Sequence, residues 1–278
     1  MKHLHHISKA AFMLAAFFLA VSCGTVPGRD SGNPQGDDPD IFESLGFFES
    51  LGFFEANSGL EVSISFQNIP QEGALGLLVR ELLCQGQDPA AYNAALVAEK
   101  QREWDDAAAE AAANSWDLPG PWYYHETIAG VMTRPRADAA AGGVPGTSLP
   151  EECFVVSRSR DYYSGGAHGM RETEYLVIDT QSLKQLGLED FFAPATADRL
   201  AGMAKDALRE NLRVKLGQNP GEPLDDGGYF EASFAMTDNF YLSPQGLGFH
   251  WGLYEIASYA MGEFDLVFGY DELAGLLR

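Results

Sequence analysis

CFVVSRSRDYYSGGAHGMRETEYLVIDTQSLKQLGLEDFF, residues 153–192, is the stretch that decides how the rest of the chain is arranged. Cys153–Arg160 and Thr173–Asp179 are rich in β-branched and aromatic residues, which is typical of strands. Between them lies YSGGAHG (163–169), whose paired glycines allow backbone angles that other residues avoid. We therefore expect a β-hairpin with a glycine–histidine bend, and the start of a helical segment at Leu188–Phe192.

The segments before this hairpin predict two strands and two helices. In EVSISFQ (61–67) apolar and polar residues alternate, as they do in a half-buried strand. The other expected elements are a helix at Ala74–Cys84 with an apolar stripe, a helix from Pro89 to Asn114 capped by Asp88, and a strand at Trp122–Met132 with an irregularity at Gly130.

The segments after the hairpin predict further helices and strands. They are a helix capped by Thr196–Asp198 and ending near Leu216, a second hairpin formed by Asn239–Leu242 and Leu247–Trp251, a loop or short helical turn at Tyr254–Gly262, a strand at Glu263–Phe268 and a short terminal helix from Asp271. Strands and helices do not alternate regularly along the chain. We therefore predict a single α+β domain over residues 60–278, with a mostly antiparallel sheet and helices packed on one face.

The charge balance restricts the partners. The 278 residues include 18 basic and 40 acidic side chains, which gives a net charge of −22. Such a surface repels phosphate backbones and anionic lipid headgroups, so nucleic acid is excluded as a partner. It favours cationic partners, although acidity that only maintains solubility is the alternative.

The N-terminus has the pattern of a secretory leader. Ala10–Val21 is an apolar run, shorter than the roughly 20 residues of a membrane span. It ends in LAVSCG, and small residues directly before Cys23 are similar to the lipobox of bacterial lipoproteins. We expect a lipoprotein signal peptide at residues 1–22 and lipidation of Cys23, with an ordinary signal peptide cut near Ser22 as the alternative. The protein would then be exported to the bacterial cell envelope and held at the membrane by its lipid anchor only.

Residues 23–59 are predicted to be a flexible tether. Gly24–Asp40 is rich in Gly, Pro and Asp, which disfavour a packed structure. The motif FESLGF then occurs at residues 42–47 and again at 48–53. Two copies are too few for a stacked repeat protein. The repeat therefore predicts either a short amphipathic helix or a linker without a specific role.

The two cysteines after the leader, Cys84 and Cys153, are candidates for a disulfide, since exported proteins often contain one. Two separate buried thiols are the alternative. The sequence has no CxxC motif and no Cys/His cluster, so we predict no structural zinc site. It also has no dinucleotide fingerprint, phosphate loop or nucleophile elbow. We therefore predict no cofactor, no metal and no catalytic residue.

A ligand-binding surface is predicted around the bend of the first hairpin. His168 lies among glycines there, and an exposed histidine can titrate near neutral pH or bind a metal. A hydrogen bond from its ring to the neighbouring backbone is the alternative. Aromatic side chains beside a carboxylate suit sugar stacking and protein contacts, but they also pack in cores. The candidate ligand-binding residues are Tyr163, Gly165, Gly166, His168, Tyr254, Glu255 and Tyr259.

Three stretches together resemble a known family. They are Tyr163–Gly169, then Asp179 through Leu188–Phe192, and then Asn239–Leu242 through Tyr254–Gly262. In this order they are similar to the extracytoplasmic domain of unknown function found in the anti-sigma factor RsiV and beside the catalytic domain of the peptidoglycan deacetylase PdaC. The similarity extends from about Leu60 to Arg278, and Ser258 departs from it where that family usually has proline.

The resemblance implies an envelope-facing module. In RsiV this domain binds lysozyme, and in PdaC the chemistry belongs to a separate catalytic domain. The expectation for this chain is therefore a non-catalytic lipoprotein that binds lysozyme, another cationic protein or peptidoglycan fragments. The acidic surface agrees with a cationic partner. A hydrolase or metal-dependent enzyme centred on His168 is one alternative, and a purely structural lipoprotein is another.

Overall fold

The structure, a computed structural model, describes residues 47–48, 51–56, 59–118, 120–135 and 149–278. All of them belong to one compact unit, Pro39–Arg278. The predicted signal peptide at residues 1–22, the lipidation site at Cys23 and most of the tether lie outside the described residues. Within the described ranges, no helix has the length and apolarity that crossing a membrane requires.

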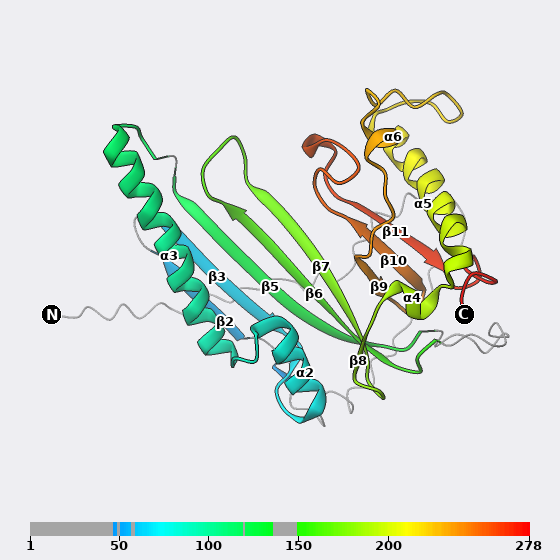
Figure 1. The fold of residues 1–278 in the computed structure, drawn as a ribbon, viewed down its shortest axis with the longest axis horizontal. Coiled ribbons are helices and arrows are strands. Elements are labelled where there is room, and N and C mark those ends of the chain that lie inside the picture. Colours follow the sequence, from blue (N-terminus) through cyan, green and yellow to red (C-terminus); the bar gives the residue numbers. More distant parts are fainter. Residues whose placement is uncertain (1–46, 49–50, 57–58, 119, 136–148) are drawn as a thin grey trace, which may run out of the picture. The chain divides into compact units, whose positions relative to one another are not determined.

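The central element is a six-stranded sheet with the strand order β2-β3-β5-β6-β7-β8 (Figure 1). Its strands are β2 (Leu51–Ala56), β3 (Leu60–Gln67), β5 (Trp122–Thr133), β6 (Cys153–Tyr163), β7 (Met170–Asp179) and β8 (Lys184–Leu186). Neighbours are antiparallel except β3 and β5, which are parallel. A parallel pair needs a long crossover connection, and two helices supply it here. The predicted hairpin of β6 and β7 is confirmed, in a register that pairs Cys153 with Asp179.

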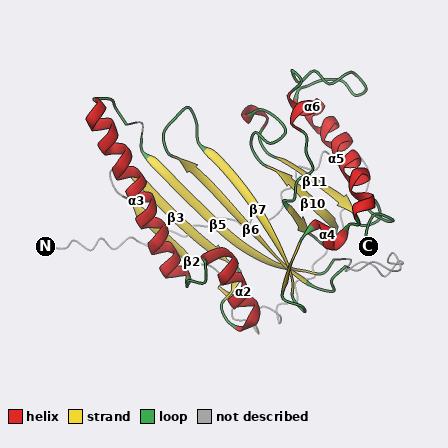
Figure 2. Ribbon diagram, viewed as in Figure 1, coloured by secondary structure: helices red, strands yellow, loops and turns green. Residues whose placement is uncertain are grey.

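Two helices, α2 (Gly73–Cys84) and α3 (Pro89–Asn114), share a core with one face of this sheet (Figure 2). In β3 every second residue from Leu60 to Phe66 is buried, as the alternation predicted. The N-terminus of α3 is also confirmed. Its capping residue Asp88 accepts hydrogen bonds from the backbone N–H groups of Ala90 and Ala91, at 3.0 and 2.9 Å.

A second, three-stranded antiparallel sheet has the order β11-β10-β9 and contains the predicted second hairpin. Its strands are β9 (Phe240–Leu242), β10 (Gly246–Trp251) and β11 (Phe264–Gly269). The remaining elements are the helices α4 (Leu188–Phe191), α5 (Pro194–Lys215) and α6 (Tyr229–Ser233), the 3₁₀ turn η2 (Tyr259–Met261) and the short pair β1 (Phe47–Phe48) and β4 (Ile69–Pro70). The α+β class with mostly antiparallel strands is confirmed, whereas the division of the strands into two sheets was not predicted.

The two sheets share a core, and the side chain of Asn239 also joins them. Val155 and Val177, from the large sheet, belong to the same buried cluster as β9, β10, β11 and α5. Asn239, directly before β9, accepts a hydrogen bond from Tyr175 N–H at 2.8 Å and donates one to the Thr173 carbonyl at 2.6 Å. Its amide group thus replaces a neighbouring strand along this part of β7.

Over the described residues of the FESLGF repeat, the sequence interpretation is wrong. Leu51–Ala56 forms β2, which pairs with β3 from Leu51 opposite Phe66 to Ala56 opposite Glu61, and is neither a helix nor a linker. The physical reason is the position of β3, whose backbone groups need a partner on the side away from β5. The ordered sheet therefore begins before residue 60.

The candidate disulfide between Cys84 and Cys153 is not formed. Both cysteines are free and buried, and they belong to separate core clusters, Cys84 with α2 and Cys153 with the second sheet. Burial raises the pKa of the Cys84 thiol to about 11 and that of Cys153 to about 12. Both thiols therefore behave as apolar core groups, which was the alternative reading.

Two helix predictions need correction. Helix α5 begins at Pro194, which suits the first turn, and the Thr196 hydroxyl donates to the Ala193 carbonyl instead of capping the helix. The residues from Asp271 onward form turns and not a terminal helix. Gly275 has a φ of 81°, outside the helical region, and Leu277 bridges to Phe192.

Gly130 pairs regularly with Val156, so the expected irregularity in β5 is absent. Glycine is required there by close packing, since a Cβ atom would lie 2.2 Å from Phe154 Cζ and 2.7 Å from the Asn68 carbonyl oxygen. We expect Gly130→Ala to lower the free energy of unfolding by about 1–3 kcal/mol, measured by urea denaturation. The control is Gly202→Ala on α5, where a Cβ meets nothing within 4 Å. It should raise that free energy by up to about 1 kcal/mol, and equal effects of the two changes would contradict the packing explanation.

Candidate functional site

The structure brings together three of the residues predicted to bind a ligand. His168 lies in the bend between β6 and β7, and Tyr254 and Tyr259 lie in the connection between β10 and β11. The imidazole stacks on the Tyr259 ring, with centroids 3.7 Å apart and an interplanar angle of 22°. Its Nε2 atom lies 3.0 Å from the Tyr254 hydroxyl. Residues about 90 positions apart in sequence thus form one contact group.

Hydrogen bonds fix the tautomer of His168. Its Nδ1 atom lies 3.0 Å from the Gly169 carbonyl oxygen, which can only accept, so Nδ1 carries the proton. In the neutral ring Nε2 then accepts from the Tyr254 hydroxyl. The Tyr259 hydroxyl donates to the same Gly169 carbonyl at 3.0 Å. Both ring nitrogens therefore hold the bend in place.

Further aromatic residues lie at the start of β5 and at the end of β6. Tyr163 stacks on Tyr123 with centroids 6.2 Å apart and donates to the Gly166 carbonyl at 3.1 Å. Gly165 and Gly166 have φ angles of 89° and 109°, which explains why the bend needs glycine. A Cβ on Gly169 would lie 2.5 Å from the Tyr123 hydroxyl, so Tyr123 reaches the backbone that holds the histidine. We call Tyr123, Tyr163, His168, Tyr254 and Tyr259 the aromatic cluster.

Glu255 does not join this cluster. Its backbone N–H donates to the Gly252 carbonyl at 3.3 Å, and its carboxylate lies beside Gly252. None of the contacts in the described part of the chain connects Glu255 with His168. Its neighbour Tyr254 has a φ of 67° and is 46% exposed, and the Tyr254 carbonyl accepts a hydrogen bond from the Tyr229 hydroxyl at 2.7 Å. The turn thus leaves the Tyr254 ring accessible to solvent, and the Glu255 carboxylate lies beside Gly252 and not in the cluster.

A second candidate site, which the sequence interpretation missed, lies between α3 and the sheet. It is a groove with a volume of about 470 Å³. Residues from α3 line one side of it, and residues from β5 and β6 line the other. Side chains that line the groove include Lys100, Trp122, Tyr124, Arg158, Arg160 and Tyr162.

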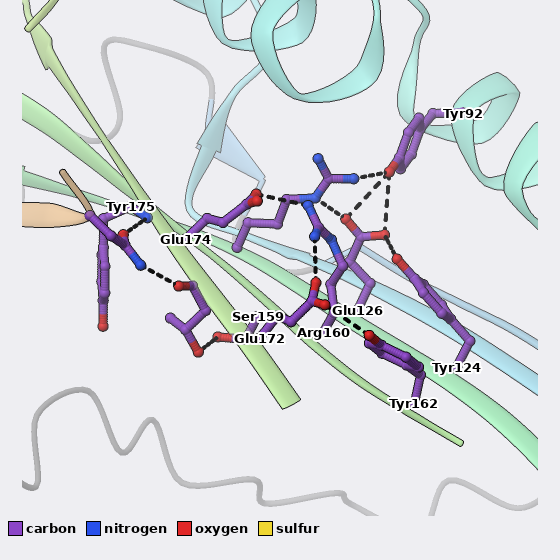
Figure 3. A network of polar contacts seen from close by, with 12 residues as sticks. Tyr92, Tyr124, Glu126, Ser159, Arg160, Tyr162, Glu172, Glu174 and Tyr175 are labelled. Carbon is purple, nitrogen blue, oxygen red and sulfur yellow. Dashed lines mark hydrogen bonds and ion pairs between the residues drawn. The ribbon is translucent and has the colours of Figure 1, made fainter. Parts of the chain in front are cut away.

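Below the groove lies a buried polar network, which Figure 3 shows from close by. Glu126 is 1% exposed, and its carboxylate accepts hydrogen bonds from Tyr124 at 3.2 Å, from Tyr92 at 3.3 Å to each oxygen, and from Arg158 Nε. Arg158 also donates to the Tyr92 hydroxyl. The acceptor positions of the carboxylate are thus filled by protein groups, and Glu126 holds its neighbours in place.

Burial and the Glu126 charge set the protonation of this network. Burial, followed by the Glu126 charge, raises the pKa of Tyr92 to about 12. The same two causes raise the pKa of Tyr124. Burial is the largest single cause and acts to lower the pKa of Arg158, but Glu126, Tyr92 and Tyr124 together outweigh it and the pKa rises. At neutral pH both tyrosines therefore keep their protons and the arginine keeps its charge.

A set of ion pairs formed by Arg160 lies next to this network. Arg160 donates to Glu172 at 2.9 Å and to Glu174 at 2.7 Å, and the Tyr162 hydroxyl donates to Glu172 at 2.8 Å (Figure 3). From α3, Lys100 Nζ lies 5.1 Å from the centre of the Tyr124 ring and pairs with Glu103 at 3.0 Å. Donors, acceptors and aromatic rings therefore alternate along this surface.

A signal for this site exists in the sequence. In WYYHETI (122–128) the inward-facing series is Trp122, Tyr124, Glu126 and Ile128, so a charge interrupts an apolar face. In β6 the series that begins with Phe154 and Val156 continues with Arg158 and Arg160. An acid and a base that both face inward on neighbouring strands favour a buried pair. Among the described residues, no group of three or more His, Cys, Asp or Glu side chains could hold a metal ion.

Comparison with known proteins connects this fold with a family of unknown function. Residues 189–271 match the family model "Protein of unknown function (DUF3298)". This range includes Tyr254 and Tyr259, whereas His168 and the groove lie before it. No curated protein matches the chain.

Two solved structures share the fold. A DUF3298 family member from Bacteroides fragilis is 23% identical with a TM-score of 0.56, and the match covers 84% of this chain and 95% of that one. A DUF3298 family protein from Pseudomonas aeruginosa is 18% identical with a TM-score of 0.50, covering 82% and 92%. These comparisons do not name RsiV or PdaC, so that resemblance stays a prediction.

Proposed function

We propose that this protein is a non-catalytic binding module of the bacterial cell envelope, anchored by a lipid on Cys23, which binds a cationic protein of the lysozyme type. The aromatic cluster is the proposed contact surface. The observation that carries the proposal is the hydrogen-bonded stack of His168, Tyr254 and Tyr259, in which Tyr254 is 46% exposed. Aromatic rings held in place before binding supply contact area at a low cost in conformational entropy.

The charge of the chain supports a cationic partner. The net charge is −22, and acidic side chains lie beside the cluster. Glu61 pairs with His125 at 2.9 Å, and the His125 ring lies 5.1 Å from the ring of Tyr123. Burial, followed by the Asp161 carboxylate, raises the pKa of Tyr123. Opposite charges on two proteins accelerate their association and disfavour wrong partners. The arrangement of His168 supports binding over catalysis, because both of its ring nitrogens already form hydrogen bonds, one with the Gly169 carbonyl and one with the Tyr254 hydroxyl.

A titration of the full-length protein with lysozyme tests the proposal. We expect binding that weakens as ionic strength rises. Tyr254→Ala should weaken it by at least about 30-fold, because truncation of a central aromatic residue at an interface typically costs 2 kcal/mol or more. Trp116→Ala is the matched control. Trp116 is an aromatic residue that is 58% exposed, and it lies after the end of α3.

The outcomes separate the alternatives. If lysozyme does not bind, or if Trp116→Ala weakens binding as much as Tyr254→Ala, the aromatic cluster is not the contact surface. If the protein hydrolyses peptidoglycan fragments and His168→Ala abolishes that activity, the enzyme alternative replaces the binding module. His168→Gln, which keeps a side-chain donor and acceptor, shows whether a loss reflects the collapse of the bend.

A further inference from the structure

We infer that the groove between α3 and the sheet is a second binding site, and that its ligand is a neutral saccharide. This goes beyond the proposed function, since the site, its residues and the class of ligand all differ from the aromatic cluster and its protein partner. A volume of about 470 Å³ lies within the range of roughly 300–1,000 Å³ that is usual for small-molecule sites.

The charges of the groove favour a neutral ligand. Its lining includes three cationic side chains, and each already contacts a carboxylate. Lys100 contacts Glu103, Arg158 contacts Glu126, and Arg160 contacts Glu172 and Glu174. Three acidic side chains, Glu99, Glu103 and Glu172, also line the groove. An anionic ligand would have to compete with these carboxylates, whereas an uncharged ligand keeps every pair intact.

The polar groups match the chemistry of sugar hydroxyls. A hydroxyl group donates one hydrogen bond and accepts others, so it suits a wall on which donors and acceptors lie side by side. Arg160, Glu172 and Tyr162 provide such a wall, with their heavy atoms 2.8–2.9 Å apart. Glu172 and Arg160 lie directly opposite each other on β7 and β6, so both heads stand on the same face of the sheet.

Aromatic rings supply the apolar part of the site. Tyr162 and Tyr124 stack with centroids 6.3 Å apart, and Trp122 lies against Trp104 at 5.2 Å. Tyr162, Tyr124 and Trp122 line the groove. Tyr162 is half-buried, which leaves part of its ring to contact the C–H groups of a pyranose.

The network around Glu126 keeps this surface in shape before a ligand arrives. A buried ion pair is seldom the most stabilising choice for a core, since apolar residues of similar size often do as well. Here it fixes Tyr92, Tyr124 and Arg158 under the groove. A surface arranged in advance loses less entropy on binding, and this strengthens the binding of a flexible ligand.

Isothermal titration calorimetry of the full-length protein, without lysozyme, tests the inference. The probes are triacetylchitotriose, which is neutral, and trigalacturonate, which is anionic. We expect triacetylchitotriose to bind and trigalacturonate to bind at least tenfold more weakly. Tyr162→Ala should weaken binding of the neutral probe by about tenfold or more, because it removes the half-buried ring that contacts the sugar. Tyr162→Phe keeps the ring and should weaken it only several-fold, by loss of the hydroxyl bonded to Glu172.

Arg171→Ala is the control for these variants. Arg171 lies on β7 beside Glu172 but faces the other side of the sheet, where it pairs with Asp161 and is largely exposed. Its removal should leave saccharide binding unchanged. Three outcomes would overturn the inference: no heat with the neutral probe at millimolar concentration, equal binding of both probes, or equal losses in Arg171→Ala and Tyr162→Ala. Because the lysozyme titration depends on Tyr254 and the saccharide titration on Tyr162, either proposal can fail without the other.

Discussion

Glu126→Gln should lower the free energy of unfolding by about 3 kcal/mol, measured by urea denaturation at neutral pH. The variant would leave the positive charge of Arg158 largely buried without its carboxylate partner. Tyr92 and Tyr124 would also lose a charged hydrogen-bond acceptor. Removing one member of a buried pair costs about 3–5 kcal/mol, and the 20% exposure of the Arg158 side chain places this pair at the low end.

Two comparisons check this explanation. The double variant Glu126→Gln/Arg158→Gln should be more stable than Glu126→Gln alone, because no unpaired charge remains in it. Asp161→Asn breaks the exposed pair with Arg171, in which both side chains are more than 40% exposed, and should cost about 0.5 kcal/mol or less. A single variant as stable as the wild type would show that solvent reaches Arg158 freely.

His250 should make stability fall as pH rises above neutral. The side chain is 3% exposed, and its nitrogens lie 3.0 Å from an Asp265 oxygen and 3.7 Å from a Glu263 oxygen. Burial acts to lower the pKa of His250, but the two carboxylates outweigh it and raise the pKa from 6.5 to about 9. The stabilisation is therefore complete below about pH 6.5 and is lost as pH rises toward 9, for a total of about 3 kcal/mol.

The measurement is a series of urea denaturation curves between about pH 6 and pH 8.5, and the thiols that begin to titrate at the upper end contribute equally to the wild type and to the variants. We expect the free energy of unfolding of the wild type to fall across this range by about 2–3 kcal/mol more than that of His250→Asn. Asp265→Asn should also flatten the profile, because it removes the nearer carboxylate. Parallel profiles for the wild type and His250→Asn would contradict the raised pKa.

The sequence predicted those elements whose signals are local. The alternation in residues 61–67 and the Asp88–Pro89 cap each depend on side chains within one turn or one strand, and both agree with the structure. The sequence does not predict the strand β2, because its conformation is determined by its pairing with β3. Leu51–Ala56 has no local feature that excludes a helix, and only pairing with β3 makes it a strand.

The candidate site was predicted only in part, for the same reason. The sequence groups His168, Tyr254 and Tyr259, and the structure shows them in contact, whereas their role in ligand binding stays a prediction. Glu255 is their neighbour in sequence, but Tyr254 has a φ of 67° and the Glu255 carboxylate lies beside Gly252. The Glu126 network depends on the parallel crossover between β3 and β5, which places α3 over the sheet, and that arrangement has no local signal.

The duplicated FESLGF motif serves two different strand pairings. LGFFEA (51–56) supplies β2 opposite β3, whereas Phe47–Phe48 of the preceding copy, LGFFES (45–50), form β1 opposite β4. Pairing between strands uses backbone groups that nearly every residue carries, so one short motif can serve both partners. Because β3 and β4 follow each other directly in the chain, a substitution in either copy would disturb a different section of the same antiparallel border.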